Sequence, residues 1–141
     1  MTNHQARSEI ERLSGEWSAA FNGDDPARAV ADLYSQDAVL LPPPGPPAFE
    51  AVAVEGRDAV AGFVQDYVDL FLEEKLPSEV REVLALGDAV LEIGTWRARH
   101  ADREREGHVM RLWRQEGGRW KVHREVFNLP HTEEPPRAAA R

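Results

Sequence analysis

Cysteine is absent from the 141-residue sequence. This absence excludes a disulfide framework, a thiolate nucleophile and any zinc or iron–sulfur site held by cysteine. Positive charge is also scarce, because 17 Lys and Arg stand against 25 Asp and Glu, for a formal net charge of −8. Such a surface repels phosphate backbones, so we do not expect a nucleic-acid partner.

Long hydrophobic runs are missing as well. No apolar run approaches the roughly 18 residues of a membrane span, so we expect no membrane partner. The segment Met1–Ile10 is polar and lacks the apolar stretch of a secretory signal, which favours a cytoplasmic location. The histidines do not form a cluster with metal-ligand spacing, so we expect no metal and no other cofactor; they stand at positions 4, 100, 108, 123 and 131.

The chain does contain enough apolar residues for one core, since 42% of its residues are hydrophobic. Its length fits a single domain, which we expect to span residues 1–130. Residues 131–141 are mostly Glu, Pro, Arg and Ala and predict a disordered tail.

Apolar residues at steps of three and four predict three helices. The first runs through Ile10–Phe21. The second begins at Pro26, where a missing N–H costs nothing, and counts Tyr34 in its apolar face. The third follows Gly56 and carries an apolar stripe from Val60 to Phe71.

The remaining segments predict strands. Ala38–Leu41 is a short one, ended by the prolines of a loop over residues 42–55. Residues 101–106 read as a charged, solvated turn between two later strands. Four further strands are expected near Glu79–Leu86, Ala89–His100, Gly107–Gln115 and Arg119–Leu129.

This order predicts an α+β fold. We expect a cone-shaped, curved antiparallel sheet with three N-terminal helices packed on its concave face. Such a cone leaves a pocket open at one end, and concave apolar pockets with a few polar groups bind small ligands.

Several motifs in this order carry a resemblance that spans roughly residues 8–129. They are Ala20-Phe21-Asn22-Gly23-Asp24, Leu33-Tyr34-Ser35-Gln36-Asp37, Glu55-Gly56-Arg57-Asp58 and Gly118-Arg119-Trp120-Lys121-Val122. With them the chain resembles the nuclear transport factor 2-like superfamily, in particular its SnoaL-like and ketosteroid-isomerase-like branch. The resemblance implies the cone fold, but this fold hosts isomerases, cyclases, hydratases, binding proteins and oligomerisation hubs.

At the three positions where the resemblance implies the catalytic residues of ketosteroid isomerases, this sequence has other residue types. Pro42 stands where the general-base Asp is expected, and it cannot carry a proton. Trp17 replaces the Tyr oxyanion donor on the first helix, and Val109 replaces the second oxyanion acid. We therefore do not expect ketosteroid isomerase activity.

Two registers are open for the last hairpin, and side-chain alternation makes the choice decisive. A three-residue loop over 117–119 places Arg111 opposite Glu125 and Trp113 opposite His123. A two-residue Gly-Gly turn is the stronger local preference, but with it Arg111 would point away from Glu125. The resemblance favours the first register. It places on the concave face Val109, Arg111, Trp113, His123, Glu125 and Phe127.

Three polar residues are the candidates for catalysis. SnoaL-like cyclases use an acidic residue on the last strand as acid and base, and Glu125 matches that position in type. Arg111 could clamp an anionic oxygen, or only pair with Glu125 and fix the register. His123 could carry a proton with Glu125 as its orienting partner, or be a surface residue.

A second set of residues is expected to bind the ligand, with ordinary core packing as the alternative: Trp17, Tyr34, Phe63, Tyr67, Val109, Trp113 and Phe127. This aromatic surface suits a flat, hydrophobic, polycyclic or polyene ligand. Alternation gives the sheet a second apolar face, for which we expect a homodimer contact, made by Met110, Leu112, Trp120, Val122 and Val126.

The sequence thus predicts a protein that binds a hydrophobic, carbonyl-bearing small metabolite. Proton transfer in a cyclase, isomerase or hydratase step would be its chemistry. The resemblance implies a setting in bacterial secondary metabolism, such as a polyketide or enediyne pathway. The alternatives are a non-catalytic carrier of a small molecule and an oligomerisation hub.

Overall fold

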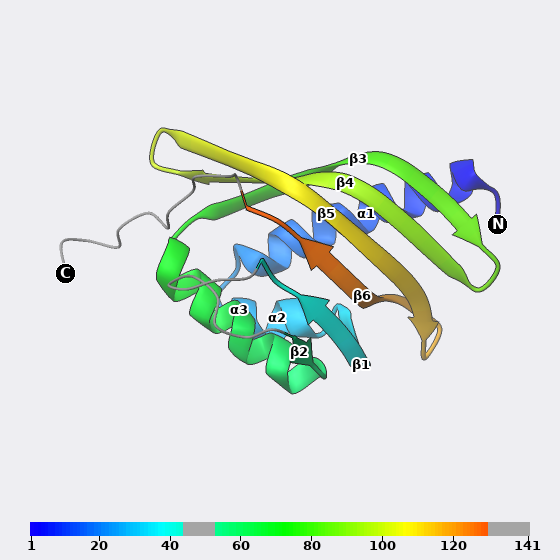
Figure 1. Ribbon diagram of the computed structural model, residues 1–141, viewed down its shortest axis with the longest axis horizontal. Coiled ribbons are helices and arrows are strands. Elements are labelled where there is room, and N and C mark those ends of the chain that lie inside the picture. Colours follow the sequence, from blue (N-terminus) through cyan, green and yellow to red (C-terminus); the bar gives the residue numbers. More distant parts are fainter. Residues whose placement is uncertain (44–52, 130–141) are drawn as a thin grey trace.

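The computed structural model describes residues 1–43 and 53–129. Six strands form one curved sheet in the order β2-β1-β6-β5-β4-β3, and three helices pack against one of its faces (Figure 1). The predicted α+β fold, with N-terminal helices on the concave side, is confirmed. The predicted tail and most of the proline-rich loop lie outside the described residues.

The three helices begin where the sequence provides capping groups. Helix α1 (Asn3–Phe21) is capped by the Thr2 side chain, which accepts a hydrogen bond from the Gln5 amide. Helix α2 (Pro26–Ala31) is capped by Asp25, and α3 (Arg57–Phe71) follows Gly56. Within the described ranges, none of the helices has both the length and the apolar character needed to cross a bilayer.

The first strand corrects two expectations. Helix α2 ends at Ala31, so Tyr34 is not on a helix but opens β1 (Tyr34–Leu41). Strand β1 runs parallel to β6, and therefore the sheet is not purely antiparallel. The short β2 (Val54–Glu55) pairs with β1 and lies within the segment predicted to be a loop.

The long strands form the predicted meander, and two of them, β3 and β5, begin earlier than expected. Strand β3 (Glu74–Leu86) contains Pro77, and its pairing with β4 (Ala89–His100) shifts between Leu76 and Glu79. Proline lacks the N–H of a regular ladder, so this edge strand passes it with an irregularity. Strand β5 (Arg103–Glu116) includes residues 103–106 of the predicted charged turn. The observed turn between β4 and β5 therefore consists only of residues 101–102.

The last hairpin combines the two registers that the sequence left open. Gly117 and Gly118 both have positive φ and make a two-residue turn into β6 (Arg119–Phe127), so Trp113 pairs with Val122. A bulge then adds one residue to β6, and beyond it Arg111 pairs with Glu125. The three-residue loop was wrong, whereas the Arg111–Glu125 pairing is confirmed.

The extra residue reverses the facing of β6 between its two halves. Val122 is fully buried against the helices, and Trp120 packs on the same core. Both were expected on the convex face. That expectation was wrong, because it assumed that side chains alternate between the two faces along the whole of β6 without a bulge. His123 is the bulged residue, and Glu125 and Phe127 return to the concave side.

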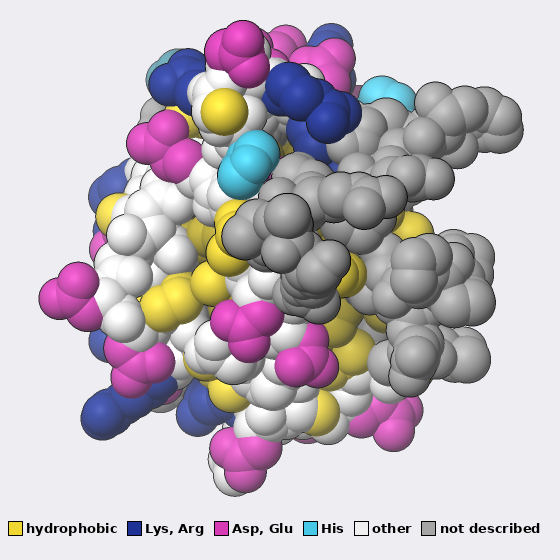
Figure 2. Space-filling view, turned by 90° about the vertical axis from the view of Figure 1, so that its left-hand side faces the viewer, with side chains coloured by type: hydrophobic (Ala, Val, Ile, Leu, Met, Phe, Trp, Pro, Cys, Tyr) yellow, Lys and Arg dark blue, Asp and Glu magenta, His cyan; other side chains and the backbone are white. Residues whose placement is uncertain are grey.

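The end of the molecule where α3 leads into β3 has a mixed surface (Figure 2). Acidic and basic side chains are both spread around this face, and hydrophobic side chains reach the surface near its middle. The excess of acidic residues therefore does not turn this face into a field of one sign.

Two strands approach each other closely at a glycine. Gly107 pairs with Trp96, and a Cβ placed on Gly107 would lie 2.5 Å from the Trp96 indole nitrogen and closer still to the Asn128 carbonyl oxygen. The same indole N–H donates to the Asn128 carbonyl at 2.7 Å. Any side chain at position 107 would therefore collide with the Trp96 ring and with the backbone at Asn128.

We expect Gly107→Ala to lower the free energy of unfolding by about 1–3 kcal/mol, because the added methyl group must displace both the Trp96 ring and the backbone at Asn128. Urea denaturation measures the loss. Gly62→Ala on α3 is the matched control, since nothing outside its own helix backbone lies within 4 Å of the place that a Cβ would take. This second change should raise stability by about 0.5–1 kcal/mol. Equal effects in the two variants would show that neither the Trp96 ring nor the Asn128 backbone restricts position 107.

Candidate functional site

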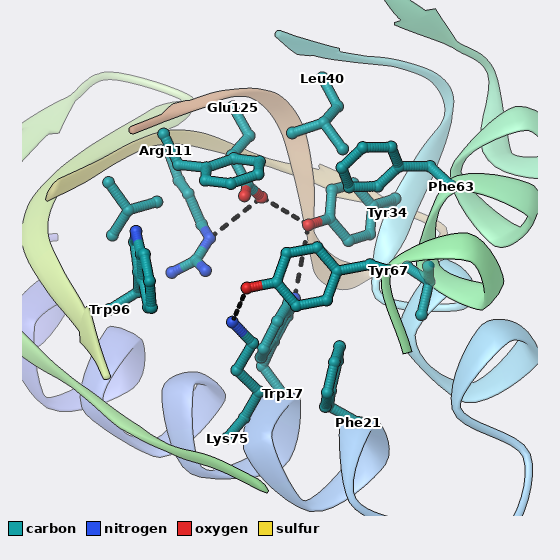
Figure 3. A pocket seen from close by; sticks show the side chains of 13 residues that line it. Trp17, Phe21, Tyr34, Leu40, Phe63, Tyr67, Lys75, Trp96, Arg111 and Glu125 are labelled. Carbon is teal, nitrogen blue, oxygen red and sulfur yellow. Dashed lines mark hydrogen bonds and ion pairs between the residues drawn. The ribbon is translucent and has the colours of Figure 1, made fainter. Parts of the chain in front are cut away.

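A cavity lies between the helices and the concave face of the sheet (Figure 3). It contains most of the residues that the sequence singled out, drawn from α1, α3 and five strands. Its walls are formed by Trp17, Phe21, Tyr34, Leu40, Phe63, Val64, Tyr67, Lys75, Trp96, Val109, Arg111, Glu125 and Phe127.

The cavity is small. The centre of a water molecule can move within a volume of about 40 Å³. One water requires about 10–15 Å³ by this measure, so the space holds a few waters or a ligand of a few heavy atoms. The polycyclic ligand suggested by the aromatic residues does not fit this volume.

Two predicted site residues lie elsewhere. Trp113 is 1% exposed in the core, and its indole N–H donates to Glu92 at 2.9 Å. His123 is turned away by the bulge, with Nδ1 3.1 Å from Ser35 Oγ. Burial, helped by the charge of Arg124, lowers the pKa of His123. The structure thus brings Arg111 and Glu125 together in the cavity lining but places His123 outside it.

Arg111 lies between two buried carboxylates on neighbouring strands. It pairs with Glu92 of β4 on one side and with Glu125 of β6 on the other. Its Nε is 3.2 Å from Glu125 Oε1, and its Nη1 is 3.4 Å from Glu92 Oε1. Burial alone would lower the pKa of Arg111, but the two carboxylates outweigh it and raise that pKa, so the guanidinium stays charged.

A phenol holds Glu125 from its other side. The Tyr34 hydroxyl donates to Glu125 Oε1 at 2.5 Å and accepts from the Trp17 indole N–H at 3.4 Å. Burial and the Glu125 charge raise the pKa of Tyr34, so the phenol keeps its proton. The hydrogen bonds and ion pairs found for Glu125 in the described structure all engage Oε1. Its Oε2 is the oxygen left for a ligand.

A second polar cluster, which the sequence analysis missed, lies across the cavity. Lys75 donates to the Tyr67 hydroxyl at 2.7 Å and is 3.0 Å from Glu73 Oε1. Tyr67 donates to the same carboxylate at 2.6 Å, and Arg105 reaches Glu73 Oε2 at 2.9 Å. Alternation along β5 from Val109 would have placed Arg105 on the concave face.

Aromatic rings surround the ammonium group of Lys75. Its Nζ lies 4.4 Å from the ring centroids of both Tyr67 and Trp96 and 5.4 Å from that of Phe21. Burial lowers the pKa of Lys75 to about 8, against the opposing charge of Glu73. The cavity therefore contains both an amine that can lose its proton near neutral pH and a carboxylate.

The charges in these two clusters balance. Glu73, Glu92 and Glu125 face Lys75, Arg105 and Arg111, and none of these side chains is more than 7% exposed. Removing one partner of a buried pair leaves a charge without water or counterion.

We expect Arg111→Met to lower the free energy of unfolding by about 3–5 kcal/mol, because Glu92 and Glu125 would then be buried without a cation. Arg12→Met is the control, as Arg12 pairs with Glu9 and Glu16 but has a side chain that is 55% exposed. That change should cost at most about 1 kcal/mol in urea denaturation. Similar losses in the two variants would contradict a special role for the buried pairs.

Sequence comparison identifies the family. The model of the SnoaL-like domain matches residues 15–123. The chain belongs to the SnoaL-like family. No curated protein matches the chain.

Solved structures share the SnoaL-like chain's fold. A nuclear transport factor 2-like protein of unknown function from Pseudomonas putida is 20% identical, with a TM-score of 0.71 and coverage of 100% of both chains. A ketosteroid isomerase-like protein from Erwinia carotovora is 20% identical, with a TM-score of 0.66 over 86% of this chain and 94% of that one. A protein of unknown function with a cystatin-like fold from Nostoc punctiforme is 11% identical, with a TM-score of 0.72 over 89% and 92%. At these identities the likeness concerns the fold alone.

Proposed function

We propose that this SnoaL-like protein binds a small carbonyl compound in the cavity and moves a proton at the carbon beside the carbonyl. The position of Glu125 carries the proposal. Its Oε1 is fixed by Tyr34 and Arg111, which leaves Oε2 for a C–H group of a ligand among apolar walls. A carboxylate held in this way has the geometry of a general base.

Arg111 supports the same chemistry at the oxygen of the ligand. When a proton leaves the carbon, negative charge builds up on the carbonyl oxygen. A fixed guanidinium at the cavity wall can stabilise that charge without reorganising. The Trp17 indole N–H is directed to the Tyr34 hydroxyl.

Acetone, the smallest ketone, tests this function through exchange of its methyl hydrogens in D2O, followed by proton NMR. We expect the protein to accelerate the exchange, and Glu125→Gln to reduce that acceleration about 100-fold. Glu82→Gln on the exposed side of β3 is the control and should leave the rate unchanged.

Wild-type exchange in Glu125→Gln would remove this residue from the mechanism. The melting temperature in the presence of acetone reports binding separately. A protein that is stabilised by acetone but does not accelerate exchange would be a carrier, the alternative function.

We also propose a homodimer through the convex face of the sheet. A mostly apolar groove there is lined by Val39, Leu41, Leu91, Met110, Leu112 and Val126, together with Arg124 and Glu125. Among these, Leu41, Met110 and Val126 are 42–44% exposed, which is unusual for three neighbouring apolar side chains. A second copy presenting the same groove would bury them.

Light scattering at micromolar concentration checks the dimer. We expect twice the monomer mass for the wild-type protein and the monomer mass for Met110→Glu. Leu86→Glu is the control, because Leu86 is 51% exposed but is not part of the groove. A wild-type monomer would refute the dimer, and a larger ring would favour the oligomerisation hub. The cytoplasmic location and the polyketide or enediyne setting stay predictions.

A further inference from the structure

Lysine is rare in this protein. Of its 17 basic residues, only Lys75 and Lys121 are lysines and the others are arginines. Lys75 points into the cavity, close to Tyr67 (Figure 3). A lysine in such a place differs chemically from an arginine, because its amine can lose a proton and become a nucleophile.

The main chain of Lys75 is held in place from both sides. The Asn22 side chain at the end of α1 accepts from the Lys75 amide at 2.8 Å and donates to its carbonyl at 2.7 Å. This clamp joins the beginning of β3 to the helix layer. The root of the side chain is thereby fixed, and its amine is held at one wall of the cavity.

Polar and aromatic groups position the amine. Glu73 and the Tyr67 hydroxyl contact Nζ, while the rings of Trp96, Tyr67 and Phe21 pack around it. The side chain of Lys75 is only 7% exposed, and it lines the cavity. A molecule that enters the cavity therefore meets this amine.

We propose that Lys75 Nζ forms an imine with a small aldehyde or ketone that enters the cavity. This step rests on the proposed function, since it requires that a carbonyl compound binds there. It adds a covalent mode of binding and a nucleophile that the proposed function does not use.

The chemistry balances within the cavity. The ammonium gives up a proton, the nitrogen lone pair attacks the carbonyl carbon, and a C–N bond forms as the C=O π bond opens. The oxygen leaves as water after taking up two protons, one from the nitrogen and the one that the ammonium first gave up. The ammonium and the carbonyl compound thus become a protonated imine and one water.

The buried charges are unchanged by this step. A protonated imine carries the same single positive charge as the ammonium that it replaces, so Glu73 keeps a cationic partner. Glu73 at 3.0 Å is also positioned to take and return the proton during the reaction. Imine formation therefore does not leave a buried carboxylate uncompensated.

The lowered pKa of Lys75 agrees with this role. With a pKa of about 8, about a tenth of the amine is neutral at pH 7. An ordinary lysine has a neutral fraction of about one in a few thousand at this pH. Burial in an apolar pocket beside another cation, here Arg105, is a known way to activate a lysine nucleophile.

An imine at Lys75 would also make the proton transfer by Glu125 easier. The protonated nitrogen withdraws electrons from the neighbouring carbon, and both residues line the same cavity. When Glu125 takes the C–H proton, the electron pair forms a C=C bond and the nitrogen becomes neutral. One positive and one negative charge disappear together, so the cavity again stays balanced.

Reductive trapping tests the proposal with the wild-type protein. Acetaldehyde is added at pH 7 with sodium cyanoborohydride, which transfers hydride to the imine carbon and leaves an ethylated lysine. Peptide mass spectrometry then compares the two lysines of the same molecule. We expect Lys75 to be ethylated about tenfold faster than Lys121, which lies outside the cavity lining. Ethylation of Lys75 at or below the rate of Lys121 overturns the proposal.

Acetone exchange separates this proposal from the proposed function. Lys75→Met should reduce the exchange as strongly as Glu125→Gln if the imine is on the route. Exchange at the wild-type rate in Lys75→Met, with Glu125→Gln inactive, would refute the imine and leave the proposed function standing. If the wild-type protein does not bind acetone at all, both the imine and the proposed function are refuted. The trapping experiment needs no variant and decides the matter even where Lys75→Met does not fold.

Discussion

The guanidinium of Arg111 is the constraint on which the concave face depends. It lies between Glu92 and Glu125, so three neighbouring strands are joined by charge as well as by their backbone hydrogen bonds. Both carboxylates are buried, and a buried carboxylate without a cation is strongly destabilising. The second oxygen of Glu92 has no hydrogen-bond partner within residues 1–43 and 53–129, which makes its contact with Arg111 the more important. A face built in this way resists sliding of one strand past another.

The bulge at His123 is what makes this arrangement compatible with a tight turn. A Gly-Gly turn followed by regular pairing would place Glu125 on the convex face, away from Arg111. One additional residue corrects the facing just before Glu125 is reached. The cost is a histidine that serves neither the core nor the cavity and is instead held at the back of the sheet by Ser35. A residue at such a position can be essential for geometry without taking part in chemistry.

The sequence predicted what depends on local rules. Apolar spacing, helix caps and turn residues were sufficient for the three helices and the four-stranded meander, and the family resemblance was sufficient for the Arg111–Glu125 pair. The bulge is missed when the choice between a two- and a three-residue turn is treated as one choice for the whole hairpin. A residue inserted within a strand leaves no composition signal of its own.

The second polar cluster, of Lys75, Tyr67, Glu73 and Arg105, was missed for a different reason. Lys75 and Arg105 stand in charged stretches, and charged side chains are exposed unless a partner compensates them. The sequence favours a solvated position for Arg105 because its partner, Glu73, is distant along the chain and is brought to it only by the pairing of β3, β4 and β5. A balanced set of buried charges is a property of the whole sheet. It can be recognised from sequence only after the alternation of every strand is known.

The wall around Lys75 depends on the exit of the last strand. The Trp96 indole, which covers the amine, donates to the carbonyl of Asn128, and Asn128 is itself bound twice to the backbone of His108. The ring is thus tied to main chain that has already left the sheet. A displacement of the main chain just after Phe127 would therefore move the Trp96 indole. Because the ring packs against the Lys75 amine, the position of the amine depends on how the chain leaves β6.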